Sequence, residues 1–368
     1  MKKETIIISA VNLVEGGPLT IFQGCLKYLS ANLADRYRIR ALVNRKDLFN
    51  FSNIEYLEFP NSKKSWINRL YYEYIYFYKL SKSLNPLLWF SLHDITPNIS
   101  AGRLAVYCHN ASPFYKLSFR EAIIDPKFAL FNFFYKYLYS INIKKADFVI
   151  VQQEWFRCSL KKFLNLKNII VAHPEAVVDC DLKNANNSVI KNKNFVFLYP
   201  SLPRVFKNFE VMAKAAGLLL KNGIRDFKVI FTISGSENSY SKNIYKVFKD
   251  TGNIKFIGIQ NKPELLELYN KADCVIFPSK LETWGLPITE AKVFSKPLLL
   301  ADLEYARETV GSYDKVIFFN PDNYAELADK MELLINNTAI FEITKAPAIP
   351  GPFSENWKEL FELLLPNV

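Results

Sequence analysis

Short apolar runs recur along this 368-residue sequence, and segments long enough for a helix separate them. The runs are nearly continuous in apolar residues, which is typical of strands that are buried on both faces. Strand, helix and strand in repetition predict a parallel α/β sheet. The predicted strands of the first half are Thr5–Ala10, Ile39–Val43, Ile54–Phe59, Leu87–Leu92, Leu104–Cys108, Phe148–Val151 and Ile169–Ala172. Those of the second half are Phe195–Tyr199, Lys228–Ile233, Ile254–Ile257, Cys274–Phe277, Pro297–Ala301 and Val316–Phe319.

The length of the chain suits two such domains. Residues 179–194 are rich in Asn, Lys and Asp and predict a linker between a domain over residues 1–178 and a second over residues 195–349. Residues 350–368 contain an amphipathic helix, roughly Glu355–Leu365. Doubly wound sheets bind ligands beyond the carboxyl ends of their strands, at the switch point. Two facing sheets therefore predict a site in the cleft between the domains.

The most informative motif follows the predicted strand Cys274–Phe277 and contains Glu282, Gly285, Pro287 and Glu290. Pro287 suits the first position of a helix, which places Glu290 in the first turn. Gly285 allows the backbone to approach a ligand, and the helix start offers N–H groups to phosphate oxygens. Two carboxylates beside an anion site are expected to accept hydrogen bonds from sugar hydroxyls, while cations hold the phosphates.

A second motif follows the predicted strand Phe195–Tyr199, where Arg204 and Lys207 precede a helical pattern that starts at Phe209. Two cations at the end of a strand, just before a helix, form a clamp for a pyrophosphate. The alternative is a pair of ordinary surface cations.

The first half contributes weaker signals. Gly16 and Gly17 form a turn after the first predicted strand. His93 and His109, the latter followed by Asn110, stand at the ends of two neighbouring strands, in a chain with only three histidines. His109 could hydrogen-bond a sugar hydroxyl or help to take the proton of the acceptor. His93 and Asn110 are candidates on the acceptor side, and either histidine could instead be structural.

Glu282 and Glu290 are eight positions apart around a Trp-Gly-Leu-Pro core, and they resemble the E-x7-E signature of retaining GT-B glycosyltransferases, family four in particular. The resemblance implies that Glu290 holds the ribose hydroxyls of the donor and that Glu282 contacts the transferred sugar. It places Gly285 and Leu286 at the donor as well. Trp284 is a mild departure, because the family usually has Phe before the glycine.

The resemblance covers most of the chain and is more specific in the second half. Arg204 and Lys207 are similar to the family's Arg/Lys pair, although they stand three positions apart and the family's are often four or five apart. The Gly16–Gly17 turn looks like the family's first loop, which reaches toward the donor phosphates. His109 matches a histidine that members often place near the donor sugar and the acceptor. Two further donor-side positions, near the nucleotide base, are Ser234 and Gly258.

The fold implied is GT-B: two Rossmann-like, doubly wound parallel-sheet domains facing a cleft, with the C-terminal helix packing back toward the N-terminal domain. The implied reaction is transfer of a hexose-type sugar, with retained configuration, from a UDP- or GDP-linked donor. Cations and helix N–H groups neutralise the leaving diphosphate, so neither a cofactor nor a metal is expected. Asp179-Cys180-Asp181 matches a D-x-D metal pattern but falls in the predicted linker.

Charge and aromatic content point to the acceptor. Residues 1–180 hold 24 Lys and Arg against 14 Asp and Glu, a net charge of +10, whereas residues 181–368 have a net charge of +1. Basic residues interleave with aromatic ones at 63–79 and 114–145, which suits a membrane interface. Aromatic helices that pack on a sheet would have almost the same sequence pattern. The basic charge can also serve only to keep the protein in solution. The hypothesis is an anionic inner leaflet carrying a lipid-linked glycan of O-antigen or capsule biosynthesis.

The remaining features bound the alternatives. The five cysteines are scattered and lack metal-ligand spacing, which favours a reduced, cytoplasmic setting. The apolar run after Lys2 and Lys3 is too short for a signal peptide, and no run reaches the roughly 20 residues that span a bilayer. Another GT-B enzyme, such as a nucleotide-sugar epimerase, or a catalytically silent relative stays open. A nucleic-acid-binding module is disfavoured, because neither clustered Lys/Arg on a helix nor an RNA-binding motif is apparent.

Overall fold

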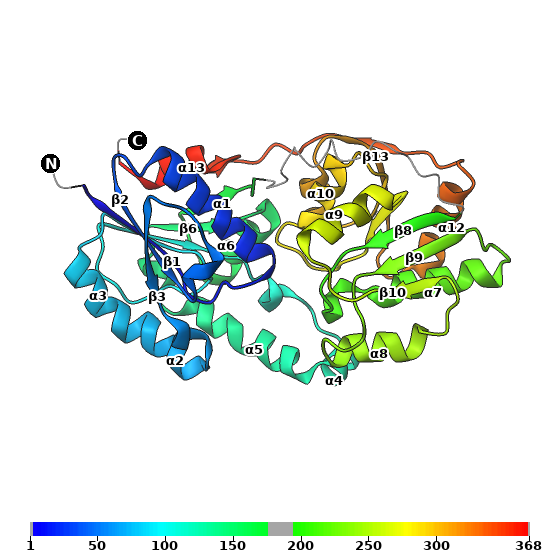
Figure 1. Cartoon of the computed structure of the whole chain (residues 1–368), viewed down its shortest axis with the longest axis horizontal. Coiled ribbons are helices and arrows are strands. Elements are labelled where there is room, and N and C mark those ends of the chain that lie inside the picture. The colour runs from blue at the N-terminus through cyan, green and yellow to red at the C-terminus, as the bar shows by residue number, and fades with distance from the viewer. Residues whose placement is uncertain (1–2, 176–193, 367–368) are drawn as a thin grey trace. The chain divides into compact units, whose positions relative to one another are not determined.

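The computed structural model describes residues 3–175 and 194–366, which divide into two compact units (Figure 1). The first unit contains residues 3–114, 132–175 and 349–366, and the second contains residues 115–131 and 194–348. The expected linker lies outside the described residues, except for Asn194. Residues 115–131 were expected in the first domain but group with the second unit, because the rings of Tyr115 and Phe128 pack against Phe206 at centroid distances of 6.0 and 5.5 Å.

An eight-stranded sheet forms the centre of the first unit, in the order β15-β7-β6-β5-β4-β1-β2-β3 with every pair parallel. The chain runs outward from β1 through β2 and β3 and then restarts at β4 on the other side, so the switch point lies between β1 and β4. The strands are β1 Thr5–Ala10, β2 Arg38–Val43, β3 Ile54–Glu58, β4 Leu88–Ser91, β5 Arg103–Tyr107, β6 Phe148–Val151, β7 Ile169–Ala172 and β15 Phe353–Ser354.

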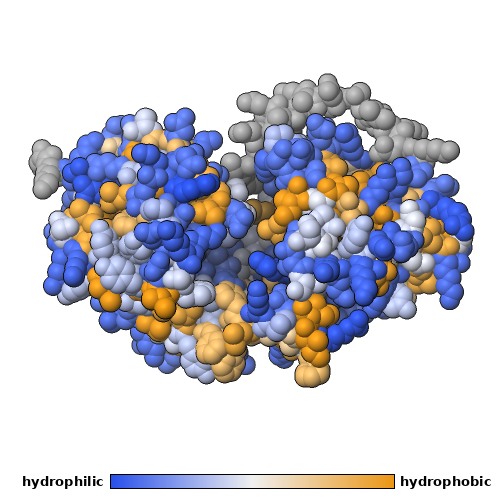
Figure 2. Space-filling view, turned by 60° about the horizontal axis from the view of Figure 1, so that its bottom comes forward, coloured by the Kyte–Doolittle hydropathy of each residue, from blue (hydrophilic) through white to orange (hydrophobic). Residues whose placement is uncertain are grey.

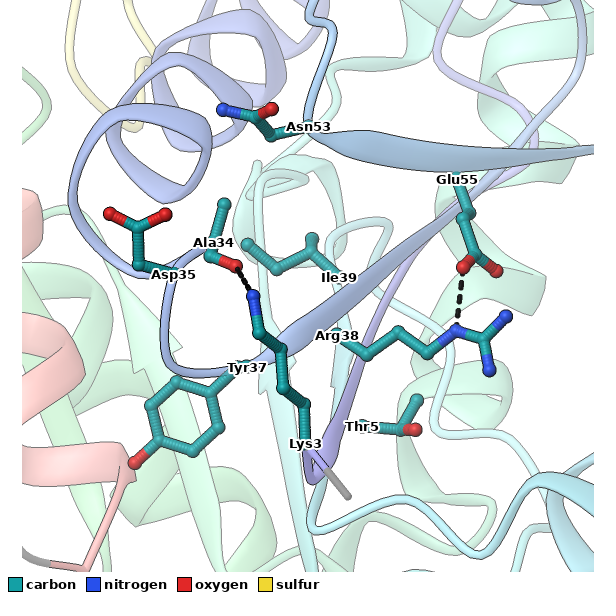
Figure 3. A pocket seen from close by; sticks show the side chains of 9 residues that line it. All are labelled: Lys3, Thr5, Ala34, Asp35, Tyr37, Arg38, Ile39, Asn53 and Glu55. Carbon is teal, nitrogen blue, oxygen red and sulfur yellow. Dashed lines mark hydrogen bonds and ion pairs between the residues drawn. The ribbon is translucent and has the colours of Figure 1, made fainter. Parts of the chain in front are cut away.

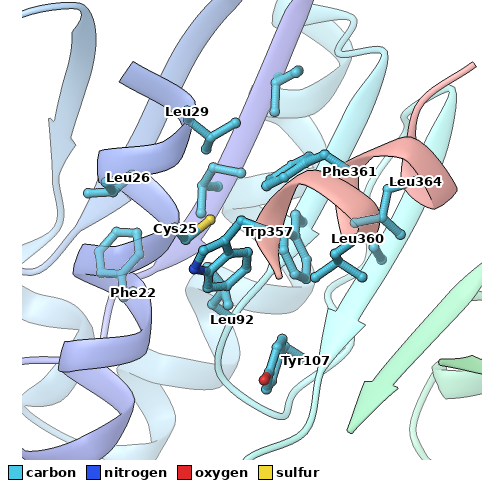
Figure 4. Packing of buried hydrophobic residues seen from close by; sticks show 14 of the residues in the cluster. Phe22, Cys25, Leu26, Leu29, Leu92, Tyr107, Trp357, Leu360, Phe361 and Leu364 are labelled. Carbon is cyan, nitrogen blue, oxygen red and sulfur yellow. The ribbon is translucent and has the colours of Figure 1, made fainter. Parts of the chain in front are cut away.

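Helices cover both faces of this sheet, with α1 and α13 on one face and α2 and α3 on the opposite one (Figure 1). Trp357 and Phe361 of α13 pack against Phe22 and Cys25 of α1 in one buried cluster (Figure 4). The segment after residue 349 thus completes the core of the first unit. The helices here are α1 Gly16–Asn32, α2 Trp66–Tyr71, α3 Phe77–Leu84, α5 Pro126–Ser140, whose first residues belong to the second unit, α6 Glu154–Leu164 and α13 Trp357–Leu364.

The second unit has a seven-stranded sheet in the order β10-β9-β8-β11-β12-β13-β14, in which only β14 is antiparallel. Its switch point lies between β8 and β11. The strands are β8 Phe195–Tyr199, β9 Phe227–Phe231, β10 Ile254–Phe256, β11 Cys274–Phe277, β12 Leu298–Ala301, β13 Tyr313–Phe319 and β14 Glu342–Thr344. The helices are α4 Phe119–Ile124, α7 Phe209–Lys221, α8 Ser239–Phe248, α9 Lys262–Lys271, α10 Leu286–Val293, α11 Glu304–Val310 and α12 Tyr324–Ile335.

The helical segment 66–84 of the first unit buries two charged residues beside the apolar Phe77 and exposes several large apolar ones. It runs from α2 through a π-helical turn, Tyr72–Tyr76, into α3. Its inner side buries an ion pair: Arg69 Nε lies 2.9 Å from Glu73 Oε1, and the two residues are 5% and 0% exposed. Its outer side exposes Trp66 and Ile67. A surface helix normally does the reverse, so this face is apolar where water is expected.

Apolar patches lie among hydrophilic residues on the face of the first unit that Figure 2 brings forward from the lower side of Figure 1. Within residues 3–175 and 194–366, no helix combines the length and apolar content needed to cross a bilayer.

Candidate active site

Two loops follow the central strands at the switch point of the second sheet, and they carry the predicted cation and acid. Strand β8 leads to Lys207, and its neighbour β11 leads to Glu282. The loops are fastened together because the backbone N–H of Lys280 donates to the carbonyl of Phe206 at 2.7 Å. The structure therefore brings together two positions that are 75 residues apart in the sequence.

Lys207 and Glu282 form an ion pair, with Nζ 2.5 Å from Oε1 and side chains 15% and 12% exposed. The backbone of Lys207 is held by strand β8, because the hydroxyl of buried Tyr199 at the end of that strand donates to the carbonyl of Lys207 at 2.6 Å. Burial raises the pKa of Tyr199, and the charge of Glu282 adds to the effect, so this hydroxyl stays a donor. Each charged group therefore compensates the other in a place with little access to water.

Arg204 lies on the same loop, directly before the short 3-10 turn Val205–Lys207. Its side chain is exposed and, among the described residues, forms no ion pair. Arg204 is thus an exposed cation on the loop after β8, three positions before the more enclosed Lys207.

Gly285 directly precedes the helix that carries Glu290. Its φ of 88° is a conformation that L side chains rarely adopt, and a Cβ there would lie 3.2 Å from the ring of Phe277. Helix α10 starts at Leu286, one residue earlier than expected, so Pro287 occupies its second position and Glu290 lies beyond the first turn. No described side chain caps this helix start. Pro287 has no N–H and that of Ile288 donates to the carbonyl of Gly285 at 2.9 Å, so the N–H of Leu286 is the donor left for an anion.

Glu290 is held by two residues that the sequence analysis missed. Its Oε1 lies 2.7 Å from Nζ of Lys262, and its Oε2 accepts a hydrogen bond of 2.8 Å from the hydroxyl of Tyr269. Both partners come from α9, which precedes β11. The polar residues of α9, the helix before β11, were the available signal. Residue spacing alone does not say which of those residues contacts Glu290.

Trp284 and the two base-side positions fit their local structure. Trp284 is 8% exposed, and its indole N–H donates to Oγ1 of Thr289 at 3.0 Å. The interior of this unit therefore accommodates an indole where the resemblance leads us to expect a Phe ring. Ser234 and Gly258 lie in the loops after the neighbouring strands β9 and β10, and a Cβ at Gly258 would lie 3.8 Å from that of Ser234. The Ser234 hydroxyl is 2.9 Å from the carboxylate of Glu237.

In the first unit, Gly16 and Gly17 are the first two residues of α1 rather than a turn before it. Gly16 has a φ of 74° and open space around its missing Cβ. Conformation, not crowding, therefore requires glycine at this position.

His109 follows β5 and stacks on Tyr107 with ring centroids 4.4 Å apart. Its Nε2 is buried and has no hydrogen-bond partner among the described residues. Burial lowers the pKa of His109 to about 4, and the nearby Asp94 carboxylate only partly opposes this. The imidazole is therefore neutral near pH 7 and has one nitrogen to offer.

Asp94 organises this edge, and sequence reasoning gave it no role. Its Oδ1 accepts the backbone N–H groups of His109 and Asn110 at 2.5 and 2.9 Å. The hydroxyls of Tyr135 and Tyr139 also donate to its carboxylate, at 3.0 and 2.9 Å. Two tyrosines four positions apart on one face of a helix were the available signal.

His93 is 1% exposed and lies at the switch point between β1 and β4. Its Nδ1 accepts from Arg69 at 2.7 Å, and its Nε2 lies 3.0 Å from the hydroxyl of Ser9. Burial lowers the pKa of His93, and the charge of Arg69 lowers it further. Both nitrogens are occupied, so the structure gives His93 a structural set of contacts rather than the open nitrogen of His109.

A polar hollow in the first unit lies at the opposite edge of the sheet, where strands begin. It is lined by Lys3, Asp35, Arg38 and Glu55 among others (Figure 3). Arg38 and Lys3 are engaged there with Glu55 and the carbonyl of Ala34. None of the predicted site residues lies in it.

Within the described part of the chain, no group of three or more His, Cys, Asp and Glu side chains is arranged to hold a metal. The Asp179-Cys180-Asp181 pattern lies outside the described residues.

Comparison with known proteins agrees with this geometry. Residues 181–347 match the model of the family described as glycosyl transferases group 1. A relative from Campylobacter jejuni, N,N'-diacetylbacillosaminyl-diphospho-undecaprenol alpha-1,3-N-acetylgalactosaminyltransferase, is 21% identical over 287 residues, which is 71% of this chain and 76% of the relative.

Solved structures share the fold of the whole chain. Anabaena HepE in complex with UDP-glucose superposes with a TM-score of 0.64 at 17% identity, covering 91% of this chain and 90% of HepE. WaaG, a glycosyltransferase involved in lipopolysaccharide biosynthesis, gives a TM-score of 0.64 at 13% identity, covering 90% and 92%. The chain is therefore a GT-B glycosyltransferase similar to those of family four.

Proposed function

We propose that this enzyme transfers a hexose-type sugar, with retained configuration, from a UDP- or GDP-linked donor to a lipid-linked glycan of bacterial surface-polysaccharide biosynthesis, either O-antigen or capsule. The observation that carries the proposal is the pairing of Lys207 with Glu282 at the switch point of the second sheet, with Glu290 on the helix that follows the Glu282 loop. One ligand with phosphates at one end and hydroxyls at the other matches this set of groups.

The chemistry follows from where charge develops. Departure of the nucleoside diphosphate leaves negative charge on its phosphate oxygens, and cations and N–H groups aimed at them stabilise the transition state. Lys207, Arg204 and the N–H of Leu286 at the start of α10 are proposed to supply those groups. Glu282, once Lys207 turns to the phosphates, accepts hydrogen bonds from the sugar. We propose that no divalent metal takes part and expect turnover to persist in EDTA.

His109 is proposed to hydrogen-bond a sugar hydroxyl. A pKa of about 4 makes its imidazole a weak base at neutral pH. We therefore propose that the acceptor's proton goes to the departing phosphate and that His109 orients rather than deprotonates. Gly16, Gly17 and Asn110 are proposed to lie along the donor and acceptor on the same unit.

Glu290→Ala is expected to weaken nucleotide binding about 10- to 100-fold, because the ribose loses hydrogen bonds to a charged group. Calorimetric titration with UDP, GDP and dTDP and their sugars would identify the base and measure the loss. Glu267→Ala is the matched control, since Glu267 is an exposed acid on α9 whose pairing with Lys271 contributes little. Wild-type protein that binds none of these nucleotides would contradict the proposed function.

We further propose that the acceptor is reached at an anionic membrane surface. The segment 66–84 supports this, because its exposed residues include Trp66 and Ile67 together with Lys79 and Lys82, and no exposed acid. Aromatic and basic side chains together suit the boundary between headgroups and acyl chains. The Campylobacter relative's name includes diphospho-undecaprenol, a lipid carrier.

Replacing both Trp66 and Ile67 by serine should weaken binding to anionic vesicles at low salt by at least about tenfold, because their apolar surface no longer enters the bilayer. Co-sedimentation with phosphatidylglycerol vesicles measures this. Ile340 and Ile343 are more exposed still, at 88% and 82%, and their double serine variant is the control that should bind normally. Equal affinity of the wild type for anionic and neutral vesicles would end the membrane proposal.

A further inference from the structure

The two carboxylate oxygens of Glu290 have partners of different kinds. Oε2 faces inward to the hydroxyl of Tyr269, and Oε1 faces outward to the ammonium of Lys262. The Tyr269 side is dry, since that residue is 0% exposed, whereas the Lys262 side chain is 47% exposed. One contact is built into the fold, and the other can be exchanged with solvent or a ligand.

Tyr269 is rigidly placed. Its ring is stacked on Phe294, with centroids 5.6 Å apart and planes inclined by 12°. Burial raises the pKa of Tyr269, and the charge of Glu290 raises it further, so the phenol keeps its proton and donates. A fixed donor on Oε2 sets the rotamer of Glu290 and the direction in which Oε1 points.

We propose that Tyr269 is a positioning residue for the donor: it fixes Glu290 so that Oε1 is presented to the ribose hydroxyls after Lys262 gives way. This inference rests on the proposed function, and it concerns the same site. Lys262 acts as the exchangeable counter-ion of the empty site. It is displaced when a diol arrives, because an exposed ion pair contributes little.

Tyr269→Phe tests the proposal because it removes one hydroxyl and keeps the stacked ring. UDP and GDP are titrated beside their 2',3'-dideoxy analogues, and the nucleotide that the wild type binds is then followed. We expect Tyr269→Phe to weaken binding of the natural nucleotide about tenfold and to change binding of the dideoxy analogue less than about twofold.

Two variants serve as controls. Tyr240→Phe removes another buried hydroxyl that donates to a carboxylate, that of Glu210, and should affect both nucleotides equally. Lys262→Gln removes the exposed partner of Glu290 and should change affinity less than about threefold. Neither change touches the hydroxyl of Tyr269.

The outcomes separate the two claims. Equal losses for natural and dideoxy nucleotides in Tyr269→Phe would mean a general structural effect and would overturn the positioning role, as would no loss at all. Both results leave the proposed function standing. A wild type that binds the dideoxy analogue as tightly as the natural nucleotide would also overturn the inference, and one that binds neither UDP nor GDP would overturn both claims.

Discussion

Lys207→Ala is expected to lower kcat about 100- to 1,000-fold, the usual effect of removing one group aimed at charge that develops in the transition state. The enclosed position of Lys207 makes its charge more effective than that of exposed Arg204. Initial rates at saturating donor, identified by the nucleotide screen, would measure the loss.

The controls separate charge from geometry. Lys207→Arg keeps the charge and should recover part of the rate, whereas Lys271→Ala removes an exposed lysine of α9 and should leave the rate unchanged. Lys207→Ala should also lower the thermal midpoint, because Glu282 is only 12% exposed and loses its partner, so the rates are compared at a temperature at which both proteins are folded. A rate within about threefold of the wild type would remove Lys207 from the reaction.

The second large effect concerns stability. Glu73→Ala at pH 8 should destabilise the first unit by about 3–5 kcal/mol, because it leaves the buried charge of Arg69 without its partner. The corresponding fall in thermal midpoint is about 6–20 °C. Burial raises the pKa of Glu73 to about 7 while Arg69 opposes the shift, so pH 8 keeps the carboxylate ionised.

Removing both charges provides the test of this reason. The double variant Arg69→Met, Glu73→Leu should recover most of the lost stability, since neither charge is then left alone in the interior. Thermal unfolding followed by circular dichroism compares the three proteins. A double variant as unstable as Glu73→Ala would show that packing, and not the unpaired charge, caused the loss.

The sheets could be read from the sequence because buried parallel strands are almost continuously apolar. All thirteen predicted strands are present, although several begin or end one to three residues away. Strands β14 and β15 were missed because Glu342–Thr344 is largely exposed and Phe353–Ser354 has only two residues, so neither forms an apolar run. Their positions depend on the neighbouring strands.

Contacts between elements were less predictable. The motifs indicated Glu282 and Lys207, but the hold of Tyr269 on Glu290 depends on how α9 and α10 lie beside β11. The aromatic segment 66–84 read equally well as a helix with its rings turned toward the sheet. The structure turns the ring of Phe77 toward Trp89 of β4, at a centroid distance of 5.6 Å, and also turns Arg69 inward, because His93 and Glu73 offer it partners. Residue spacing does not contain that information.

The return of the chain to the first unit has a consequence for biosynthesis. Trp357, Leu360 and Phe361 fill the core beneath α1, and β15 adds to β7, although more than 300 residues separate Phe22 from Trp357. A ribosome must therefore finish the whole second unit before the first can close its interior. During that interval α1 has an open apolar flank, and contacts this distant in sequence form slowly. The second unit, most of which is the contiguous segment 194–348, can fold before the core of the first unit is complete.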